Sequence, residues 1–272
     1  MNTKELTAKA YQLRRDILEM IYRGKAGHFG GSFSVIDILT ALYFKHMNVS
    51  PENINSPDRD RFILSKGHCA EALYAVLADR GFFPKSDLET FSQFGSQLTG
   101  HPNNIVNGVE MNSGSLGHGL SVSVGMALAS KMDAVPYHVY VVMGDGELAE
   151  GSVWEGAMSA GHYKLDNLVA VIDRNRLQIS GGTEDVMTQD CLNKRWESFG
   201  WFVIECDGHD MASLDKALTQ AKTTIEQPTV IIANTIKGKG FSKAENNAAW
   251  HHKVPSEQEY LDCIAELAER QV

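Results

Sequence analysis

The sequence predicts an α/β protein with a mostly parallel sheet and helices on both faces. Short runs of strand-forming apolar residues recur along the chain, and segments with helical periodicity separate them. Strands joined by helical crossovers run parallel, and near-continuous apolar strands are typical of a sheet that is covered on both faces. Because no linker or internal repeat stands out, residues 1–272 are expected to form one domain.

Five apolar runs are expected to form the strands. They are RFILS (61–65), HVYVVM (138–143), LVAVID (168–173), WFVIECD (201–207) and PTVIIANTI (228–236). Each run has a length typical of strands and is rich in β-branched or aromatic residues.

The segments around these runs have helical patterns. They cover residues 3–23, 34–47, 70–81, 120–132, 152–163, 210–225 and 256–270. In the first segment, Leu6, Leu13 and Ile17 recur at helical spacing and predict one buried face. Ser32 or Ser34 is the expected N-cap of the second segment.

Composition excludes several classes of protein. The net charge of -9 argues against a nucleic-acid-binding surface, which needs basic residues to displace counterions. No apolar segment is long enough to cross a membrane, and the first ten residues are too polar for a secretory signal. The four cysteines have no metal-ligand spacing and are expected to be reduced thiols, which favours a cytoplasmic location.

A glycine-flanked aspartate follows the second apolar run, in Gly144-Asp145-Gly146. Asn175 follows the third run, thirty positions after Asp145, so both side chains are expected at one edge of the sheet. Acidic residues there would repel a bare phosphate, but carboxylate and amide oxygens suit Mg²⁺ or Ca²⁺ bound between protein and diphosphate.

A second glycine-rich turn, at 114–117, opens a helix whose first N–H groups are able to bind a diphosphate. Taken alone, each of these features is more often a structural turn than a site. Their spacing and shared sheet edge together favour a metal–diphosphate site.

Seven short motifs occur in the order found in transketolases. They are AGHFGG (26–31), LSKGH (64–68), GHP (100–102), SGSLGHG (113–119), GDGELAEG (144–151), IDRNRLQISG (172–181) and WHHKVP (250–255). Over nearly all of its length, the chain resembles the N-terminal, thiamine-diphosphate-binding domain of that family. Full-length transketolases are more than twice as long, so the resemblance is to the N-terminal subunit of a transketolase split into two chains.

The resemblance implies a divalent metal, Mg²⁺ or alternatively Ca²⁺ or Mn²⁺, held by Asp145, Asn175 and the backbone carbonyl of Leu177. It also implies a larger set of residues that contact thiamine diphosphate. These are His68, Gly114, Ser115, Leu116, Asp145, Gly146, Glu147, Asn175 and His251. For Glu147 a solvated side chain is the alternative, and the adjacent His252 competes with His251 for the same position.

The implied reaction transfers a two-carbon ketol unit from a ketose or ketose phosphate to an aldose or aldose phosphate. Protons must then move at sugar oxygens near neutral pH, a range that suits histidine. The implied catalytic residues are His28, His68, His101, His251 and Glu150, with Glu150 in a carboxylate link across a dimer interface. The histidines expected to be structural are His46, His138, His162 and His209.

Two parts of the family's site have no counterpart in this chain: a glutamate at the aminopyrimidine of the cofactor, and arginines that hold a sugar phosphate. We therefore expect a partner chain, the C-terminal transketolase subunit, in an α2β2 assembly. Phe29, His118 and WHHKVP depart from the proline, glutamine and HGAP that many full-length members carry, which leaves the substrate contacts open.

Other functions stay open at this point. The chain could belong to another thiamine-diphosphate enzyme, such as a 2-oxoacid dehydrogenase or a deoxyxylulose-phosphate synthase, or be a non-catalytic diphosphate-binding module. A plain nucleotide-binding α/β protein is disfavoured, because no GxGxxG follows an early strand.

Overall fold

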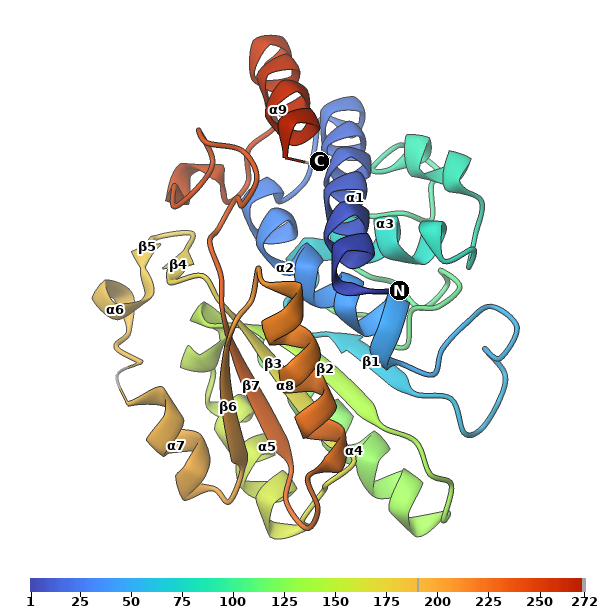
Figure 1. The fold of residues 1–272 in the computed structure, drawn as a ribbon, viewed down its shortest axis with the longest axis vertical. Helices are drawn as coiled ribbons and strands as arrows, with labels where there is room; N and C mark the ends of the chain where they lie inside the picture. The colour runs from blue at the N-terminus through green and yellow to red at the C-terminus, as the bar shows by residue number, and fades with distance from the viewer. Residues whose placement is uncertain (190, 271–272) are drawn as a thin grey trace.

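The strands form a five-stranded parallel sheet and a separate antiparallel ribbon (Figure 1). The computed structural model describes residues 1–189 and 191–270, and the large sheet has the order β1-β2-β3-β7-β6. Its strands are β1 (Arg61–Leu64), β2 (Val139–Gly144), β3 (Leu168–Arg174), β6 (Phe202–Asp207) and β7 (Thr229–Asn234). All neighbouring pairs in this sheet are parallel, which confirms the predicted fold class.

The helices alternate with the strands as expected. They are α1 (Thr3–Gly24), α2 (Phe29–Ala41), α3 (Ala70–Asp79), α4 (Gly119–Met132), α5 (Gly151–His162), α6 (Thr183–Val186), α7 (Leu192–Ser198), α8 (Met211–Thr223) and α9 (Glu257–Glu269). The ribbon consists of β4 (Leu177–Gln178) and β5 (Gly181–Gly182). The ribbon, α6 and α7 were not predicted, because elements this short have little periodicity.

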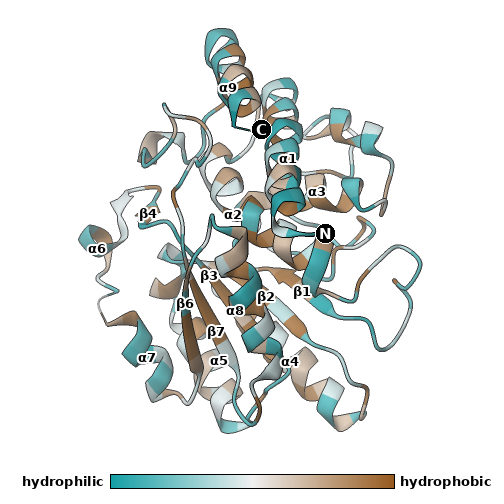
Figure 2. Ribbon diagram, viewed as in Figure 1, coloured by the Kyte–Doolittle hydropathy of each residue, from teal (hydrophilic) through white to brown (hydrophobic). Residues whose placement is uncertain are grey.

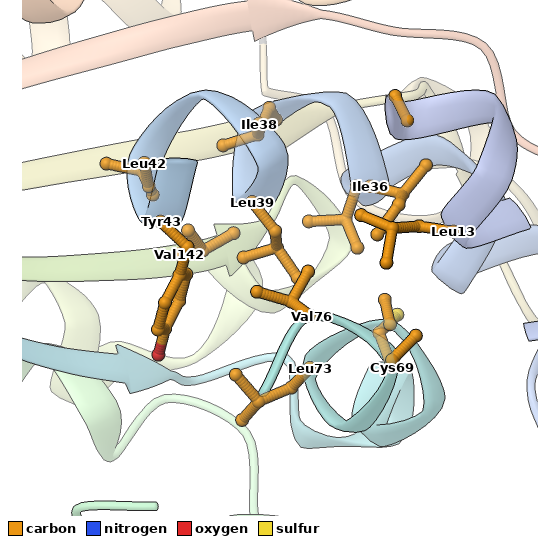
Figure 3. Close-up of a cluster of buried hydrophobic side chains, with 14 of the residues drawn as sticks. Leu13, Ile36, Ile38, Leu39, Leu42, Tyr43, Cys69, Leu73, Val76 and Val142 are labelled. Carbon is orange, nitrogen blue, oxygen red and sulfur yellow. The ribbon is translucent and has the colours of Figure 1, made fainter. Parts of the chain in front are cut away.

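Helices cover both faces of the sheet. Tyr140 and Val142 of β2 belong to a buried cluster with residues of α1, α2, α3 and α8. Val141 and Met143, which point the other way, belong to a second cluster with residues of α4, α5 and α7. Figure 2 shows the strands largely in the colour of apolar residues between these layers. In Figure 3, side chains from α2 and α3 meet beside Val142.

The first and last helices pack against each other. Tyr260 of α9 stacks on Tyr22 of α1 with ring centroids 4.3 Å apart, and its hydroxyl donates to Glu19 at 2.5 Å. Ser256 caps α9 in a reciprocal capping box with Glu259. The predicted closing helix at 256–270 is therefore confirmed.

The prediction for the start of α2 was wrong. The helix begins at Phe29, so neither Ser32 nor Ser34 is its N-cap. Both serines lie inside the buried helix, where Ser32 Oγ donates to Glu71 at 2.7 Å and Ser34 Oγ donates to Asp173 at 2.6 Å. The two preceding glycines indicated a break, but they are helical residues where a side chain would collide with neighbouring atoms.

Within the described part of the chain, none of the helices has the length and apolar character needed to cross a bilayer.

Candidate metal and diphosphate site

The predicted metal-binding and cofactor-binding residues converge on a cavity of about 260 Å³ at the carboxyl ends of β2, β3 and β7. Nine of the ten line it: His68, Gly114, Leu116, Asp145, Gly146, Glu147, Asn175, Leu177 and His251. Ser115, the tenth, is exposed and lies outside the lining. Because Gly144 of β2 is paired with Asp173 of β3, the loops that follow these strands lie side by side, as the spacing predicted.

Asp145 is held in place by backbone N–H groups. Its side chain is buried, and Oδ2 accepts a hydrogen bond from Arg176 N at 2.5 Å, while Oδ1 accepts from Gly146 N at 2.9 Å. Burial and the nearby negative charge of Asp173 raise the pKa of Asp145 to about 6. A cation beside this carboxylate would relieve both effects.

Asp145, Asn175 and Leu177 fit a hard divalent cation. They offer a carboxylate, a side-chain amide and a backbone carbonyl at one cavity, and Mg²⁺ completes such sets with phosphate and water oxygens. The amide of Asn175 is oriented by Nδ2, which donates to Ser34 Oγ at 3.4 Å. Across residues 1–189 and 191–270, no three His, Cys, Asp or Glu side chains form a metal cluster. The oxygen set at the cavity differs from such a cluster, because only one of its three donors, Asp145, is a carboxylate.

Glu147 corrects one of the two interpretations made from the sequence. It is 2% exposed, so the solvated alternative is wrong. Its carboxylate accepts from Ser65 Oγ and from the backbone N–H groups of Gly117 at 2.8 Å and Gly144 at 3.1 Å. Burial raises the pKa of Glu147. The side chain thereby ties the 114–117 turn to the end of β2 at the cavity wall.

Lys66 and Asp173 form a buried ion pair that sequence reasoning missed. Their side chains are 1% and 0% exposed, and Asp173 also accepts hydrogen bonds from Ser34 and Thr235. Burial disfavours the charge on each, but the partner's opposite charge prevails, so the pKa of Lys66 is raised and that of Asp173 is lowered. Lys66 lies inside the quoted LSKGH motif, and this was the available signal.

Lys237, which follows β7, was also missed. It is 2% exposed and lines the cavity, and its Nζ lies 2.8 Å from His251 Nδ1 and donates to the Leu177 carbonyl at 3.2 Å. Burial and the positive charge of Lys66 lower the pKa of Lys237 to about 8. Two lysines therefore lie at the cavity, where an anionic ligand would contact them.

The predicted catalytic histidines form one cluster around His28. Its ring centroid lies 5.4 Å from that of His68, 5.9 Å from His101, 5.6 Å from His251 and 4.6 Å from His252. Of these rings, only His68 and His251 line the cavity, while His252 is exposed.

Four rings of the cluster, those of His28, His68, His101 and His251, are neutral at pH 7. Burial, with the neighbouring His252 and His101, lowers the pKa of His28 to about 4. Burial and Lys237 lower the pKa of His251 to about 3, and burial lowers the pKa of His68 and of His101 as well. Neutral imidazoles are able both to donate and to accept hydrogen bonds with hydroxyl groups.

Glu150 lies apart from the cavity. It is exposed at the start of α5, and its backbone N–H donates to the carbonyl of Glu147 at 3.0 Å. The exposed Glu150 side chain is therefore accessible to another chain and does not line the cavity.

Comparison with known proteins decides the family. A family model described as "Transketolase, thiamine diphosphate binding domain" matches residues 6–264. The chain belongs to this transketolase family. The predicted resemblance is confirmed, and the family is a thiamine-diphosphate-binding one.

Subunits of split transketolases are similar to this chain along its whole length. An apulose-4-phosphate transketolase subunit of Phocaeicola vulgatus is 48% identical over 270 residues, which cover 99% of this chain and 96% of that protein. A 6-deoxy-6-sulfo-D-fructose transketolase subunit of a Clostridium species is 43% identical over 264 residues, covering 97% and 96%. The chain thus has the extent of the N-terminal subunit of a split transketolase.

Full-length transketolases match over part of their length. The crystal structure of the Campylobacter jejuni transketolase superposes with a TM-score of 0.91 at 32% identity, covering 98% of this chain and 43% of that one. Human transketolase is 42% identical over 245 residues, which are 90% of this chain and 39% of the human protein. The chain therefore spans about two-fifths of a full-length transketolase.

Proposed function

We propose that this chain is the diphosphate-binding and metal-binding subunit of a two-chain transketolase, and that its 272 residues form one domain. The enzyme transfers a two-carbon ketol unit between sugars or sugar phosphates. The observation that carries the proposal is the convergence of oxygen donors, two lysines and neutral histidines on one cavity, in a chain of this family.

Each side of the cavity has its own role. Asp145, Asn175 and the Leu177 carbonyl hold Mg²⁺, with Ca²⁺ or Mn²⁺ as substitutes, and the metal neutralises a diphosphate that the acidic side chains would otherwise repel. Gly146 and the 114–116 turn lie against the diphosphate. Bound thiamine diphosphate supplies the electron sink that carbon–carbon bond cleavage needs.

The histidines act on the sugar. His68 and His251 contact the diphosphate side, while His28 and His101 face the hydroxyl and carbonyl oxygens of the substrate. His28 Nδ1 supports this assignment, because it is buried without a hydrogen-bond partner among the described residues. A sugar hydroxyl would satisfy it and exchange a proton with it.

The rest of the active site comes from a second chain. The C-terminal transketolase subunit brings the groups at the aminopyrimidine and the sugar phosphate, in an α2β2 assembly. Exposed Glu150 lies at the interface between chains. This chain alone is therefore expected to bind the cofactor weakly and to have little or no activity.

A calorimetric titration tests the proposal. Thiamine diphosphate is titrated into the chain with and without Mg²⁺, first alone and then with the C-terminal subunit of the same organism, and ketol transfer is assayed in the mixture. We expect metal-dependent binding, and transfer only with both chains. No metal-dependent binding in either case would refute the proposal. Decarboxylation of pyruvate without ketol transfer would favour a 2-oxoacid enzyme instead.

Two variants separate the metal site from the sugar site. Asp145→Ala removes the only carboxylate of the donor set and should abolish metal-dependent cofactor binding. His101→Ala is the matched control, because His101 lies beside His28 but outside the cavity lining, and it should keep binding while lowering turnover. Equal affinity of both variants for the cofactor would disprove the metal assignment.

A further inference from the structure

A buried cluster of Arg14, Asp37 and His209 lies outside the cavity. Arg14 of α1 donates from Nη1 and Nη2 to the two carboxylate oxygens of Asp37 in α2, at 3.0 Å and 2.6 Å. Asp37 Oδ2 is also 2.7 Å from Nδ1 of His209, in the loop after β6. Arg14 and Asp37 are buried, and His209 is half-buried. The sequence predicted that His209 is a structural residue, but one of its contacts is to Ile236, which directly precedes the cavity-lining Lys237.

The other ring nitrogen of His209 binds the backbone. Ile236 N lies 2.7 Å from His209 Nε2. Because a backbone N–H donates, Nε2 is the acceptor, and Nδ1 therefore carries the proton that binds Asp37. The imidazole is thus held in one neutral tautomer, in which Nδ1 donates to Asp37 and Nε2 accepts from Ile236 N.

Arg14 holds the same loop at a second point. Its Nε donates to the carbonyl of Lys239 at 2.9 Å. Ile236 and Lys239 bracket a tight turn in which Gly238 has φ +76 and donates to the Gly30 carbonyl at 2.9 Å. A side chain at Gly238 would place Cβ 2.4 Å from a backbone oxygen, so the turn follows one path.

The turn carries Lys237 into the cavity. The position of Lys237 Nζ, 2.8 Å from His251 Nδ1 and 3.2 Å from the Leu177 carbonyl, depends on where the backbone of residues 236–239 lies. The cluster binds that backbone on both sides of Lys237 and touches neither the cavity nor the metal donors.

We propose that His209 is a positioning residue, which fixes the 236–239 turn through its bond to Ile236 N and thereby places Lys237 against the diphosphate. Asp37 and Arg14 hold the His209 tautomer that makes this bond. The role of Lys237 toward the diphosphate rests on the proposed function, whereas the link from His209 to the turn stands on the structure alone.

Two substitutions at His209 separate its roles. His209→Gln places an amide oxygen near the position of Nε2 and keeps an acceptor for Ile236 N. His209→Asn places an amide near the position of Nδ1, so it keeps the bond to Asp37 and loses the acceptor. His46→Asn is the matched control, because His46 also bonds a carboxylate, Asp215 at 2.9 Å, and lines no part of the cavity.

The first readout needs no cofactor. The ring nitrogen resonances of His251 and the exchange rate of the Ile236 amide are measured by NMR on the full chain. We expect faster exchange and shifted His251 resonances in His209→Asn, and parent-like values in His209→Gln and His46→Asn. Unchanged His251 resonances in a folded His209→Asn variant would overturn the proposal. If His209→Asn does not fold, parent-like values in His209→Gln support the proposal, and disturbed values refute it.

The second readout is the affinity for thiamine diphosphate with Mg²⁺ in the two-chain enzyme. His209→Asn should bind about tenfold more weakly, the factor that one hydrogen bond contributes, while His209→Gln binds like the parent. A purely structural role would lower the stability of both variants without this difference in affinity. If the parent itself does not bind the cofactor, the proposed function fails, and the His251 resonances still decide the role of His209.

Discussion

The buried ion pair of Lys66 and Asp173 should be the most sensitive point of the fold. Both side chains are at most 1% exposed, so removing one partner leaves an uncompensated charge without water. Lys66→Met leaves the Asp173 carboxylate with hydrogen bonds from the neutral groups of Ser34, Thr235 and Asn175 but without a counter-ion. Asp173→Asn leaves the Lys66 ammonium without its counter-ion. Each single substitution should lower the free energy of unfolding by about 3–5 kcal/mol. That is a large share of the roughly 5–15 kcal/mol that stabilises a typical domain.

The double variant Lys66→Met with Asp173→Asn should recover much of this loss, because it buries no net charge. The assay is urea unfolding at pH 7.5, followed by circular dichroism and by the fluorescence of the four tryptophans. The coupling energy of the double-mutant cycle should be at least about 2 kcal/mol. Additive effects, or a loss below about 1 kcal/mol in either single variant, would show that the pair does not act as argued.

Three further predictions concern stability and protonation. Burial raises the pKa of Glu71 from 4.5 to about 7, so the stability that the protonated carboxyl group contributes is present below pH 4.5 and lost as the pH rises through 7. Glu71→Gln should therefore be more stable than the parent at pH 8, by up to about 3 kcal/mol in urea unfolding. Equal stability of the two proteins at pH 8 would contradict this. Gly117 has φ +85, and a Cβ would lie 2.7 Å from that of Glu150. Gly117→Ala should lose about 1–3 kcal/mol in thermal unfolding, whereas Gly125→Ala, in an open helical position, should gain up to about 1 kcal/mol; an equal response of the two would exclude the steric explanation. NMR titration of His28 should give a midpoint near 4, with stability falling as the pH drops from 6.5 toward that value, and a midpoint above 6 would show that the ring is not buried as described.

The sequence predicted the sheet well, because each core strand is a nearly continuous apolar run. LVAVID, for example, became β3 within one residue at its carboxyl end. The order of the strands in the sheet could not be predicted from the sequence. Nothing in the pattern of β6 or β7 indicates that β7 lies between β3 and β6, since periodicity reports which residues are buried and not which strands are neighbours.

The candidate metal-binding side chains that could be predicted from the sequence are those whose motif directly follows a predicted strand. Asp145 and Asn175 follow adjacent strands, and this could be deduced from spacing. The burial of Lys66 and Lys237 at the site could not be deduced from the sequence, because a lysine in a loop is normally solvated. Only the fold shows that both side chains are enclosed. Glu147 shows the same limit, since a carboxylate becomes a buried acceptor only when three donors from separate segments surround it.

The strand order has a consequence for synthesis of the chain on the ribosome. β7, at Thr229–Asn234, is an interior strand of the sheet although it follows the other four strands in the sequence. β1, β2 and β3 are able to pair while the chain is still growing, but β6 has no partner until β7 emerges. Lys237 follows β7, so the cavity is completed only after β7 has emerged. Because contacts between residues distant in the sequence form slowly, the edges of β3 and β6 stay unpaired and prone to aggregation until β7 joins the sheet.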